Sequence, residues 1–150
     1  MQKAAGVDCH VTTIERYEKA ADIAKKNFCE AGITDRITLL IGEAKEILPD
    51  LVLASYDMVF LDGAKGQYPL FLPMLLKLLK TGGLLVCDNV LYKGMTAEDS
   101  LKIRRKRTIV ARLRKFLKMI VEDESMKTSI LPIGDGVSIS IKLYDKEDNR

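Results

Sequence analysis

Short runs of apolar residues alternate along the chain with longer segments in which apolar residues recur at helical spacing. The short runs contain many β-branched residues and are bounded by turn residues, which is typical of strands buried in a sheet. They cover residues 11–14, 37–41, 56–61, 84–87, 128–131 and 137–143. The helical pattern covers residues 16–31, a short stretch that ends near residue 48, and residues 68–79 and 97–121. The sequence therefore predicts alternating strands and helices.

Turn residues mark the ends of several predicted elements. Gly32 follows the helix 16–31, and Pro49 stops the short helix before it. The last two strands are joined only by residues 132–136, and so short a Gly-rich connection forces them into an antiparallel hairpin. We therefore expect an α/β fold with a doubly wound, mostly parallel sheet and a final antiparallel hairpin, in a single domain over residues 1–150.

The composition fits a folded globular protein. The chain has 150 residues, of which 47% are hydrophobic and 30% charged, a balance unlike that of disordered chains. No apolar run approaches the ~20 residues that cross a bilayer, and no basic and apolar leader precedes the first strand, so we expect neither a membrane span nor an export signal. Cys9, Cys29 and Cys87 lack metal-ligand spacing, and reduced thiols in the cytoplasm are the simplest account of them.

Three oxygen-bearing side chains follow two consecutive strands of the predicted parallel sheet. Asp62 comes directly after strand 56–61, and Asp88 and Asn89 come directly after strand 84–87. Neighbouring strands lie ~4.8 Å apart, and ligands collect at their carboxyl ends, so these groups can converge on one ion. Two carboxylates and an amide oxygen suit Mg²⁺ or Ca²⁺ better than zinc. Asp and Asn also cap helices and turns, so spacing alone leaves both interpretations open.

Three further candidates lie beside strand ends. Glu15 ends the first predicted strand, where a carboxylate can accept hydrogen bonds from both hydroxyls of a ribose, and Glu43 follows the next strand. A helix cap is the alternative for both, and for Glu15 taken alone it is the better interpretation. Lys65 follows Asp62 by three residues and would lie over the ion, which favours the neutral amine that a general base requires. Most lysines are simply solvated, so this role also stays open.

Basic residues dominate the predicted helix 97–121, and no acidic residue interrupts residues 101–121. The basic residues are Lys102, Arg104, Arg105, Lys106, Arg107, Arg112, Arg114, Lys115 and Lys118. Apolar residues recur at helical spacing between them, so one side of the helix packs on a core. The basic side is either a solvated helix face or a phosphate-contacting surface for RNA or another polyanion.

Taken together, these residues resemble the cation-dependent S-adenosylmethionine O-methyltransferases. That family includes catechol and caffeoyl-CoA O-methyltransferases and a bacterial tRNA 5-hydroxyuridine methyltransferase. The resemblance runs from about Val11 to Leu143, and it implies a Rossmann-like fold. It rests on five short motifs in the order of the family: Thr13-Ile14-Glu15, Gly42-Glu43-Ala44, Phe60-Leu61-Asp62-Gly63-Ala64-Lys65, Asp88-Asn89-Val90-Leu91 and Pro132-Ile133-Gly134-Asp135-Gly136. Each motif is weak alone, but together they form a specific pattern.

The resemblance implies a role for each matching position. Glu15 would bind the ribose hydroxyls of S-adenosylmethionine, and Glu43 and Ala44 would border its adenine. Asp62, Asp88 and Asn89 would hold Mg²⁺, or another divalent cation such as Ca²⁺ or Mn²⁺. Asp62 would also lie near the amino-acid end of the cosubstrate. Lys65 would be the catalytic base.

The chain departs from the family at its N-terminal end. The family has a strand and a Gly-rich loop before the segment that matches Val11, whereas about ten residues with the single glycine Gly6 precede it here. The resemblance therefore predicts an N-terminally truncated domain that lacks its usual first strand, which is the central one, and its Gly-rich loop. Because unpaired buried backbone is costly, we expect re-pairing of strands or another chain to close the gap.

Two functions follow from these patterns. The first is Mg²⁺-dependent methyl transfer from S-adenosylmethionine to a hydroxyl of a substrate with two adjacent oxygens, either a catechol-like small molecule or tRNA 5-hydroxyuridine. The second is a catalytically inactive α/β remnant that binds RNA or a partner chain through its basic helix. A nicotinamide-dependent dehydrogenase is disfavoured because the Gly-x-Gly-x-x-Gly motif is absent. The resemblance also implies a homodimer.

Overall fold

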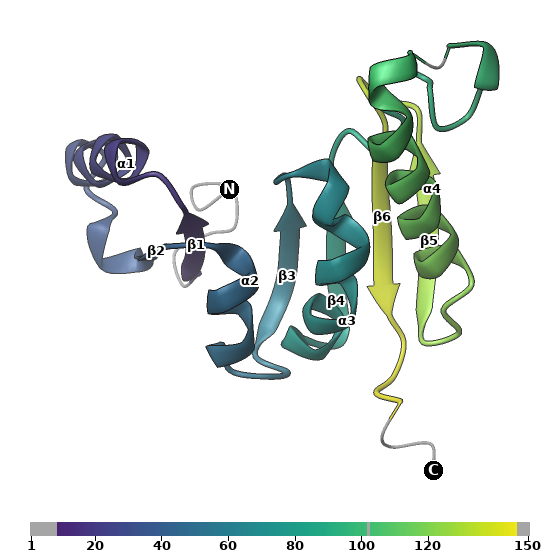
Figure 1. Cartoon of the computed structure of the whole chain (residues 1–150). Helices are drawn as coiled ribbons and strands as arrows, with labels where there is room; N and C mark the ends of the chain where they lie inside the picture. The colour runs from purple at the N-terminus through teal and green to yellow at the C-terminus, as the bar shows by residue number, and fades with distance from the viewer. Residues whose placement is uncertain (1–8, 102, 147–150) are drawn as a thin grey trace. The chain divides into compact units, whose positions relative to one another are not determined.

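The structure, a computed structural model, describes residues 9–101 and 103–146. The chain divides into two compact units, residues 1–51 and residues 52–150, and each unit is described by itself. Figure 1 shows the helices and strands of both units. Within the described residues, no helix is long and apolar enough to cross a membrane.

The described part of the first unit contains a small parallel sheet and two α-helices. Strand β1 (Val11–Glu15) pairs with β2 (Ile37–Ile41) in parallel, from Val11↔Ile37 to Glu15↔Ile41. Helix α1 (Glu18–Glu30) lies between them in sequence, and the one-turn helix α2 (Ala44–Ile47) follows β2. Helix α1 begins two residues later than the pattern predicts, because Tyr17 is extended and its N–H donates to the Glu15 carboxylate at 2.8 Å.

The second unit contains a four-stranded mixed sheet in the order β3-β4-β6-β5. Strand β3 (Tyr56–Leu61) is parallel to β4 (Leu79–Cys87). Strand β6 (Val137–Lys142) is antiparallel to both β4 and β5 (Met126–Leu131). The predicted α/β fold with parallel strands and a final antiparallel hairpin is therefore confirmed.

Helices α3 (Tyr68–Leu78) and α4 (Arg107–Val121) cover one face of this sheet (Figure 1). The core of the unit lies between these helices and the sheet, and Leu85 and Cys87 of β4 are fully buried in it. The rings of Tyr68 and Phe116 meet edge to face, with centroids 5.3 Å apart. Lys142 is also buried, and its ammonium donates to the carbonyls of Leu76 and Leu79, which satisfies carbonyls at the C-terminal end of α3.

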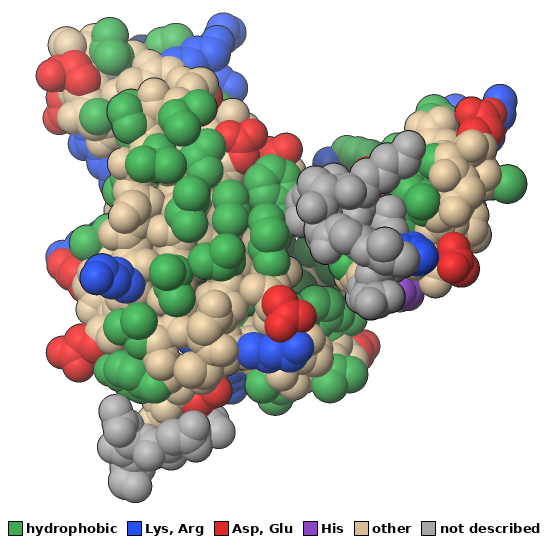
Figure 2. Space-filling view, turned by 180° about the vertical axis from the view of Figure 1, so that it is seen from behind, with side chains coloured by type: hydrophobic (Ala, Val, Ile, Leu, Met, Phe, Trp, Pro, Cys, Tyr) green, Lys and Arg blue, Asp and Glu red, His purple; other side chains and the backbone are tan. Residues whose placement is uncertain are grey.

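The other face of the sheet carries a stripe of apolar side chains that this unit leaves partly exposed. Alternate residues of three neighbouring strands form it in register: Met58, Phe60, Leu84, Val86, Ile139 and Ile141. Phe60 is 46% exposed and Ile141 42%. Figure 2 shows hydrophobic side chains gathered on the side of the molecule that faces away from the viewer in Figure 1. Within the described part of this unit, helices therefore cover only one face of the sheet.

The expected break in the sheet is visible in the strand pairing. Among the described residues, β1 pairs only with β2, and the second edge of β3 pairs with no strand. The chain thus forms two separate sheets rather than one. Re-pairing within the described residues, which was one of the two predicted ways to close the gap, does not occur.

The starts of β4 and α4 differ most from their predicted positions. Strand β4 begins at Leu79 rather than 84, but its register jumps from Tyr56↔Leu79 to Met58↔Leu84, so residues 80–83 bulge out and regular pairing resumes at Leu84. The helix predicted from residue 97 begins only at Arg107, after two short 3₁₀ turns. Leu101 and Ile103 are about half exposed, since the apolar spacing of the helix does not extend to them.

Candidate functional site

The ends of β3 and β4 bring the predicted ion ligands to adjoining positions. Leu61 and Cys87 are the last paired residues of the two strands, so Asp62 and Asp88 each come directly after a paired residue. The Asp88 N–H donates to the carbonyl of Leu61 at 3.1 Å, which continues the pairing past the strand ends. The carboxyl-bearing residues therefore lie side by side at one edge of the sheet.

Lys65 lies directly against one of these carboxylates. It begins a 3₁₀ turn (Lys65–Gln67) after β3, and its ammonium donates to Asp62 Oδ1 at 2.6 Å. The Lys65 side chain is only 16% exposed, whereas that of Asp62 is 49% exposed. Lys65 is therefore the more buried partner of this ion pair. Its positive charge offsets the charge of Asp62 and leaves that of Asp88.

Tyr68, which the sequence analysis assigned only to the start of a helix, connects the parts of this site. It is fully buried, and its hydroxyl lies 3.0 Å from the Leu61 carbonyl and 3.2 Å from the Asp88 carbonyl. It also accepts a hydrogen bond from Lys65 Nζ at 3.1 Å. Burial, together with the acidic groups around it, raises the pKa of Tyr68 far above its usual value, so the hydroxyl remains a donor. Its position three residues after Lys65 was the available signal.

Asn89 lies in a tight loop after β4. Its φ is +54°, a left-handed conformation that Asn tolerates better than most residues, and its N–H donates to Asp88 Oδ1 at 2.6 Å. The loop is held by the segment between β5 and β6, since Val90 N–H donates to the Gly136 carbonyl and Leu91 N–H donates to the Asp135 carbonyl. The Pro-Ile-Gly-Asp-Gly motif therefore supports the loop that carries Asn89.

A glycine is required where these two loops meet. Gly136 has a φ of +86°, and a Cβ there would lie 2.3 Å from Leu91 Cγ. In contrast, Gly134 has open space around it. The close approach of Leu91 explains why the motif ends in glycine.

The donor chemistry of this edge fits a hard divalent cation. Asp62 and Asp88 supply carboxylate oxygens, and Asn89 can supply an amide oxygen, which is the all-oxygen set that Mg²⁺ and Ca²⁺ prefer. No group of three His, Cys, Asp or Glu side chains suited to a metal occurs within residues 9–101 and 103–146. The predicted ligand set contains two carboxylates, and its third ligand is the Asn89 amide. A group of three His, Cys, Asp or Glu side chains would therefore not include it.

Three of the four predicted cosubstrate residues, Glu15, Glu43 and Ala44, lie together in the first unit, whereas Asp62 belongs to the second. Glu15 and Ile41 are the last paired residues of β1 and β2, and the Gly42 N–H donates to the Glu15 carbonyl at 3.0 Å. Glu43 comes next, 3.6 Å from the Arg16 guanidinium, and Ala44 begins α2. The structure thus forms two clusters of predicted residues, one at the strand ends of each unit.

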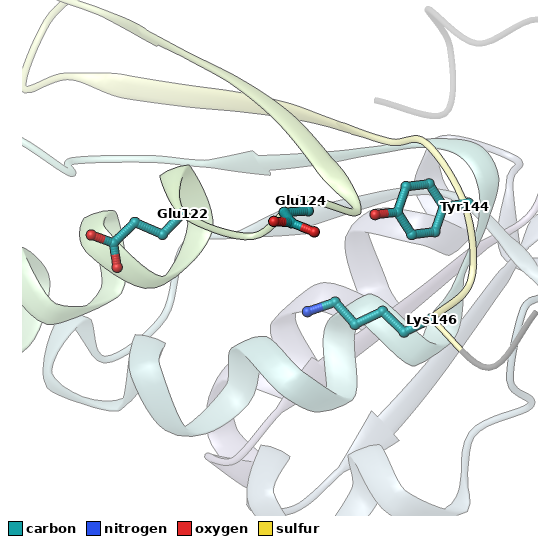
Figure 3. A pocket seen from close by; sticks show the side chains of 4 residues that line it. All are labelled: Glu122, Glu124, Tyr144 and Lys146. Carbon is teal, nitrogen blue, oxygen red and sulfur yellow. The ribbon is translucent and has the colours of Figure 1, made fainter. Parts of the chain in front are cut away.

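A hollow of about 480 Å³ elsewhere in the second unit is lined by Glu122, Glu124, Tyr144 and Lys146. In Figure 3 the Tyr144 hydroxyl points toward Glu124, while Glu122 points away from the other three side chains. Tyr144 follows β6, whose C-terminal end lies beside the start of regular pairing in β4. The hollow is therefore at the end of the sheet opposite Asp62 and Asp88.

Comparisons with known proteins agree with the motifs. A family model described as O-methyltransferase matches residues 1–143. A Mycolicibacterium vanbaalenii protein named as an O-methyltransferase is 34% identical over 128 residues, which make up 85% of this chain and 55% of that protein. The chain therefore spans little more than half the length of this relative.

Solved structures show the same fold. The O-methyltransferase TomG from Streptomyces achromogenes, in complex with S-adenosylmethionine, is 26% identical with a TM-score of 0.81 over 93% of this chain and 64% of that chain. An O-methyltransferase from Bacillus cereus, in complex with S-adenosylhomocysteine, is 26% identical with a TM-score of 0.78 over 89% of this chain and 62% of that chain. The match to the family model over nearly the whole chain shows that the chain belongs to the O-methyltransferase family.

Proposed function

We propose that this chain is the greater part of a Mg²⁺-dependent O-methyltransferase that uses S-adenosylmethionine and acts on a hydroxyl beside a second oxygen. The observation that carries the proposal is the meeting of Asp62, Lys65 and Asp88 around the buried Tyr68 hydroxyl at adjoining strand ends. Relatives of the same fold bind S-adenosylmethionine or its product, which supports the choice of cosubstrate.

Each group has a distinct part in this proposal. Asp62, Asp88 and Asn89 would hold the cation, which would supply a Lewis acid that binds both substrate oxygens and favours loss of a hydroxyl proton. Lys65, as the free amine, would accept that proton. The oxygen then forms a bond to the methyl carbon as the carbon–sulfur bond breaks, and the electron pair of that bond stays on sulfur. The sulfonium thereby becomes the neutral thioether of S-adenosylhomocysteine.

The first unit would bind the cosubstrate. We propose that Glu15 accepts hydrogen bonds from the ribose hydroxyls and that Glu43 and Ala44 border the adenine, because the three residues lie together at the carboxyl ends of parallel strands. Two substrate types have the required pair of oxygens, namely a catechol-like small molecule and tRNA 5-hydroxyuridine. We also propose a homodimer in the cytoplasm, a compartment that suits three cysteines that are not joined in disulfides.

The proposed cation site can be tested by titrating Mg²⁺ into the chain in a calorimeter. All three proposed ligands lie in the second unit, so the chain as it stands is the right sample. Asp88→Asn should weaken Mg²⁺ binding by at least about tenfold, because it removes a charged ligand. Asp57→Asn is the matched control, since Asp57 is an exposed carboxylate in β3 whose one ion-pair partner among the described residues is Lys80. A wild-type chain that binds no Mg²⁺, or equal losses in the two variants, would rule out the site.

A second candidate function is binding without catalysis. Among the described residues the outer edge of β3 pairs with no strand, and this favours the second candidate, because a parallel strand without a neighbour gives less support to the Asp62 that follows it. This candidate predicts no transfer of a labelled methyl group to a catechol or to tRNA at saturating Mg²⁺. Transfer that Asp88→Asn abolishes would exclude it.

A further inference from the structure

We propose that the outer surface of α4 and of the 3₁₀ turn before it binds the phosphate backbone of RNA and thereby presents RNA to the strand ends at Asp62 and Asp88. We call this the basic surface, and it comprises Arg104, Arg105, Lys106, Arg107, Arg112, Arg114, Lys115 and Lys118. The choice of RNA as the polyanion rests on the proposed function, whereas binding of phosphates rests on charge and geometry alone.

The basic residues of α4 share one side of the helix. Val110, Leu113, Phe116 and Ile120 are buried against the sheet and α3. At 100° per residue, the positions from Arg107 to Lys118 that carry a positive charge fall outside this buried arc. Arg107, Arg112, Lys115 and Lys118 are exposed. The solvent side of α4 is therefore positively charged along its whole length.

Much of this charge is not neutralised by the protein. Within the described residues, no acidic side chain pairs with Arg104, Arg105, Arg107 or Lys115, and all four are exposed. Ion pairs occur only with Arg114, which binds Asp99, and Lys118, which is 3.8 Å from Glu122. A row of cations without counter-charges raises the local potential and attracts polyanions.

The basic surface is physically continuous with the loops of the candidate site. Arg112 donates to the carbonyl of Gly66, the residue after Lys65, at 3.3 Å. Arg114 donates to the carbonyls of Met95 and Thr96, in the loop that follows Asn89. Lys106 Nζ lies 5.9 Å from the centre of the Tyr92 ring in the same loop. A chain of phosphates along α4 would therefore lead to the edge of the sheet that holds Lys65 and Asn89.

Chemistry favours RNA over the other polyanions. A helix that binds a membrane surface buries an apolar side in the lipid, but the apolar side of α4 is already buried in the protein. DNA carries the same phosphates, yet 5-hydroxyuridine, the proposed substrate whose base has two adjacent oxygens, is a nucleoside of RNA. The surface is also hollowed, by about 460 Å³, where Asp99, Arg107, Ala111 and Arg114 meet. The basic surface thus fits a flexible polyanion that also supplies a substrate for the neighbouring site.

Fluorescence anisotropy with a short labelled stem–loop RNA tests the proposal, without cosubstrate or cation, so the result does not depend on catalysis. The test variant is Arg107→Glu with Lys115→Glu on α4, and the matched control is Lys25→Glu with Lys26→Glu on the exposed side of α1. Both doubles change the net charge equally. At ~0.1 M salt the α4 double should bind at least about tenfold more weakly, with a salt slope smaller by about 1.5, while the α1 double binds as wild type.

Three results would overturn the proposal. Equal loss in the two double variants would mean that binding follows net charge rather than the basic surface. Equally tight binding of a DNA of the same sequence, or tighter binding of anionic phosphatidylserine vesicles, would reject RNA as the occupant. Absence of RNA binding by a wild-type chain that still binds Mg²⁺ would reject the basic surface and leave the proposed cation site intact.

Discussion

Replacement of Tyr68 by Phe isolates the effect of one hydroxyl on the candidate site. The ring stays in place against Phe116, and because the side chain is fully buried, the change leaves no cavity beyond one oxygen atom. What disappears is a group that lies within hydrogen-bonding distance of the Leu61 and Asp88 carbonyls and of Lys65. The perturbation therefore acts on the connection between the ends of β3 and β4.

The loss in free energy of unfolding follows from the hydrogen-bond partners that the former neighbours of the Tyr68 hydroxyl keep in the variant. The Leu61 carbonyl still accepts from the Asp88 N–H, and Lys65 still donates to Asp62, so neither group is left without a partner. The loss is then one to two hydrogen bonds at about 1 kcal/mol each, plus weaker solvation of a partly buried carbonyl. We expect a free energy of unfolding lower by about 2 kcal/mol, which is large against the ~5–15 kcal/mol of a typical domain.

Urea denaturation followed by circular dichroism measures this loss. Tyr144→Phe is the matched control, since the Tyr144 hydroxyl makes no hydrogen bond within the described residues and its loss should cost under about 0.5 kcal/mol. The midpoint of the Tyr68→Phe transition should fall while the m-value stays the same. Equal stability of the two variants would refute the reasoning, because it would mean that the Tyr68 hydroxyl carries no net structural energy.

Two further substitutions test the loop and the far end of the sheet. Gly136→Ala should destabilise the fold by about 2–4 kcal/mol, since it adds strain at a φ of +86° and a clash with Leu91. Gly134→Ala should cost only about 1 kcal/mol, and Leu91→Ala added to Gly136→Ala should relieve the clash. Thermal melts of the three variant proteins check these expectations. Burial opposes ionisation of Asp123, but hydrogen bonds from Lys146 and Ser125 outweigh it and hold its pKa below the usual value. A carboxyl whose pKa is lower folded than unfolded stabilises the fold above its unfolded pKa and loses this effect as pH falls through its folded pKa. Asp123→Asn should therefore cost about 1 kcal/mol at pH 7 and progressively less as the pH falls through the folded pKa, and a cost that stays constant as the pH is lowered would contradict the assignment.

The part of the site that follows from strand patterns was predictable from the sequence. Asp62 and Asp88 each come directly after a short apolar run, and the parallel register of β3 and β4 then fixes them as neighbours. The spacing of three residues between Asp62 and Lys65 likewise predicted that Lys65 would lie over the ion site, and in the structure its ammonium donates to Asp62 Oδ1 at 2.6 Å. These inferences depend only on local periodicity, so they required no knowledge of tertiary packing.

The parts that the sequence did not reveal depend on contacts between distant segments. The Tyr68 hydroxyl donates to the Asp88 carbonyl, twenty residues away, and although Tyr68 follows Lys65 by three residues, its apolar neighbours are typical of an ordinary core residue. Arg114 likewise donates to the carbonyls of Met95 and Thr96, nearly twenty residues earlier in the sequence, and periodicity alone does not reveal such a contact.

The division into two units separates the two kinds of binding that methyl transfer requires. The proposed ion ligands and base all come from residues after 52, and they are held by contacts within the second unit. The proposed cosubstrate residues Glu15 and Glu43 belong to the first unit. Under the proposed function, Mg²⁺ binding would depend on ligands of the second unit alone, whereas methyl transfer would also need the first unit. Conditions that unfold the first unit alone should abolish transfer and leave cation affinity unchanged, because the free energy of each binding step is linked to the unit that carries its ligands.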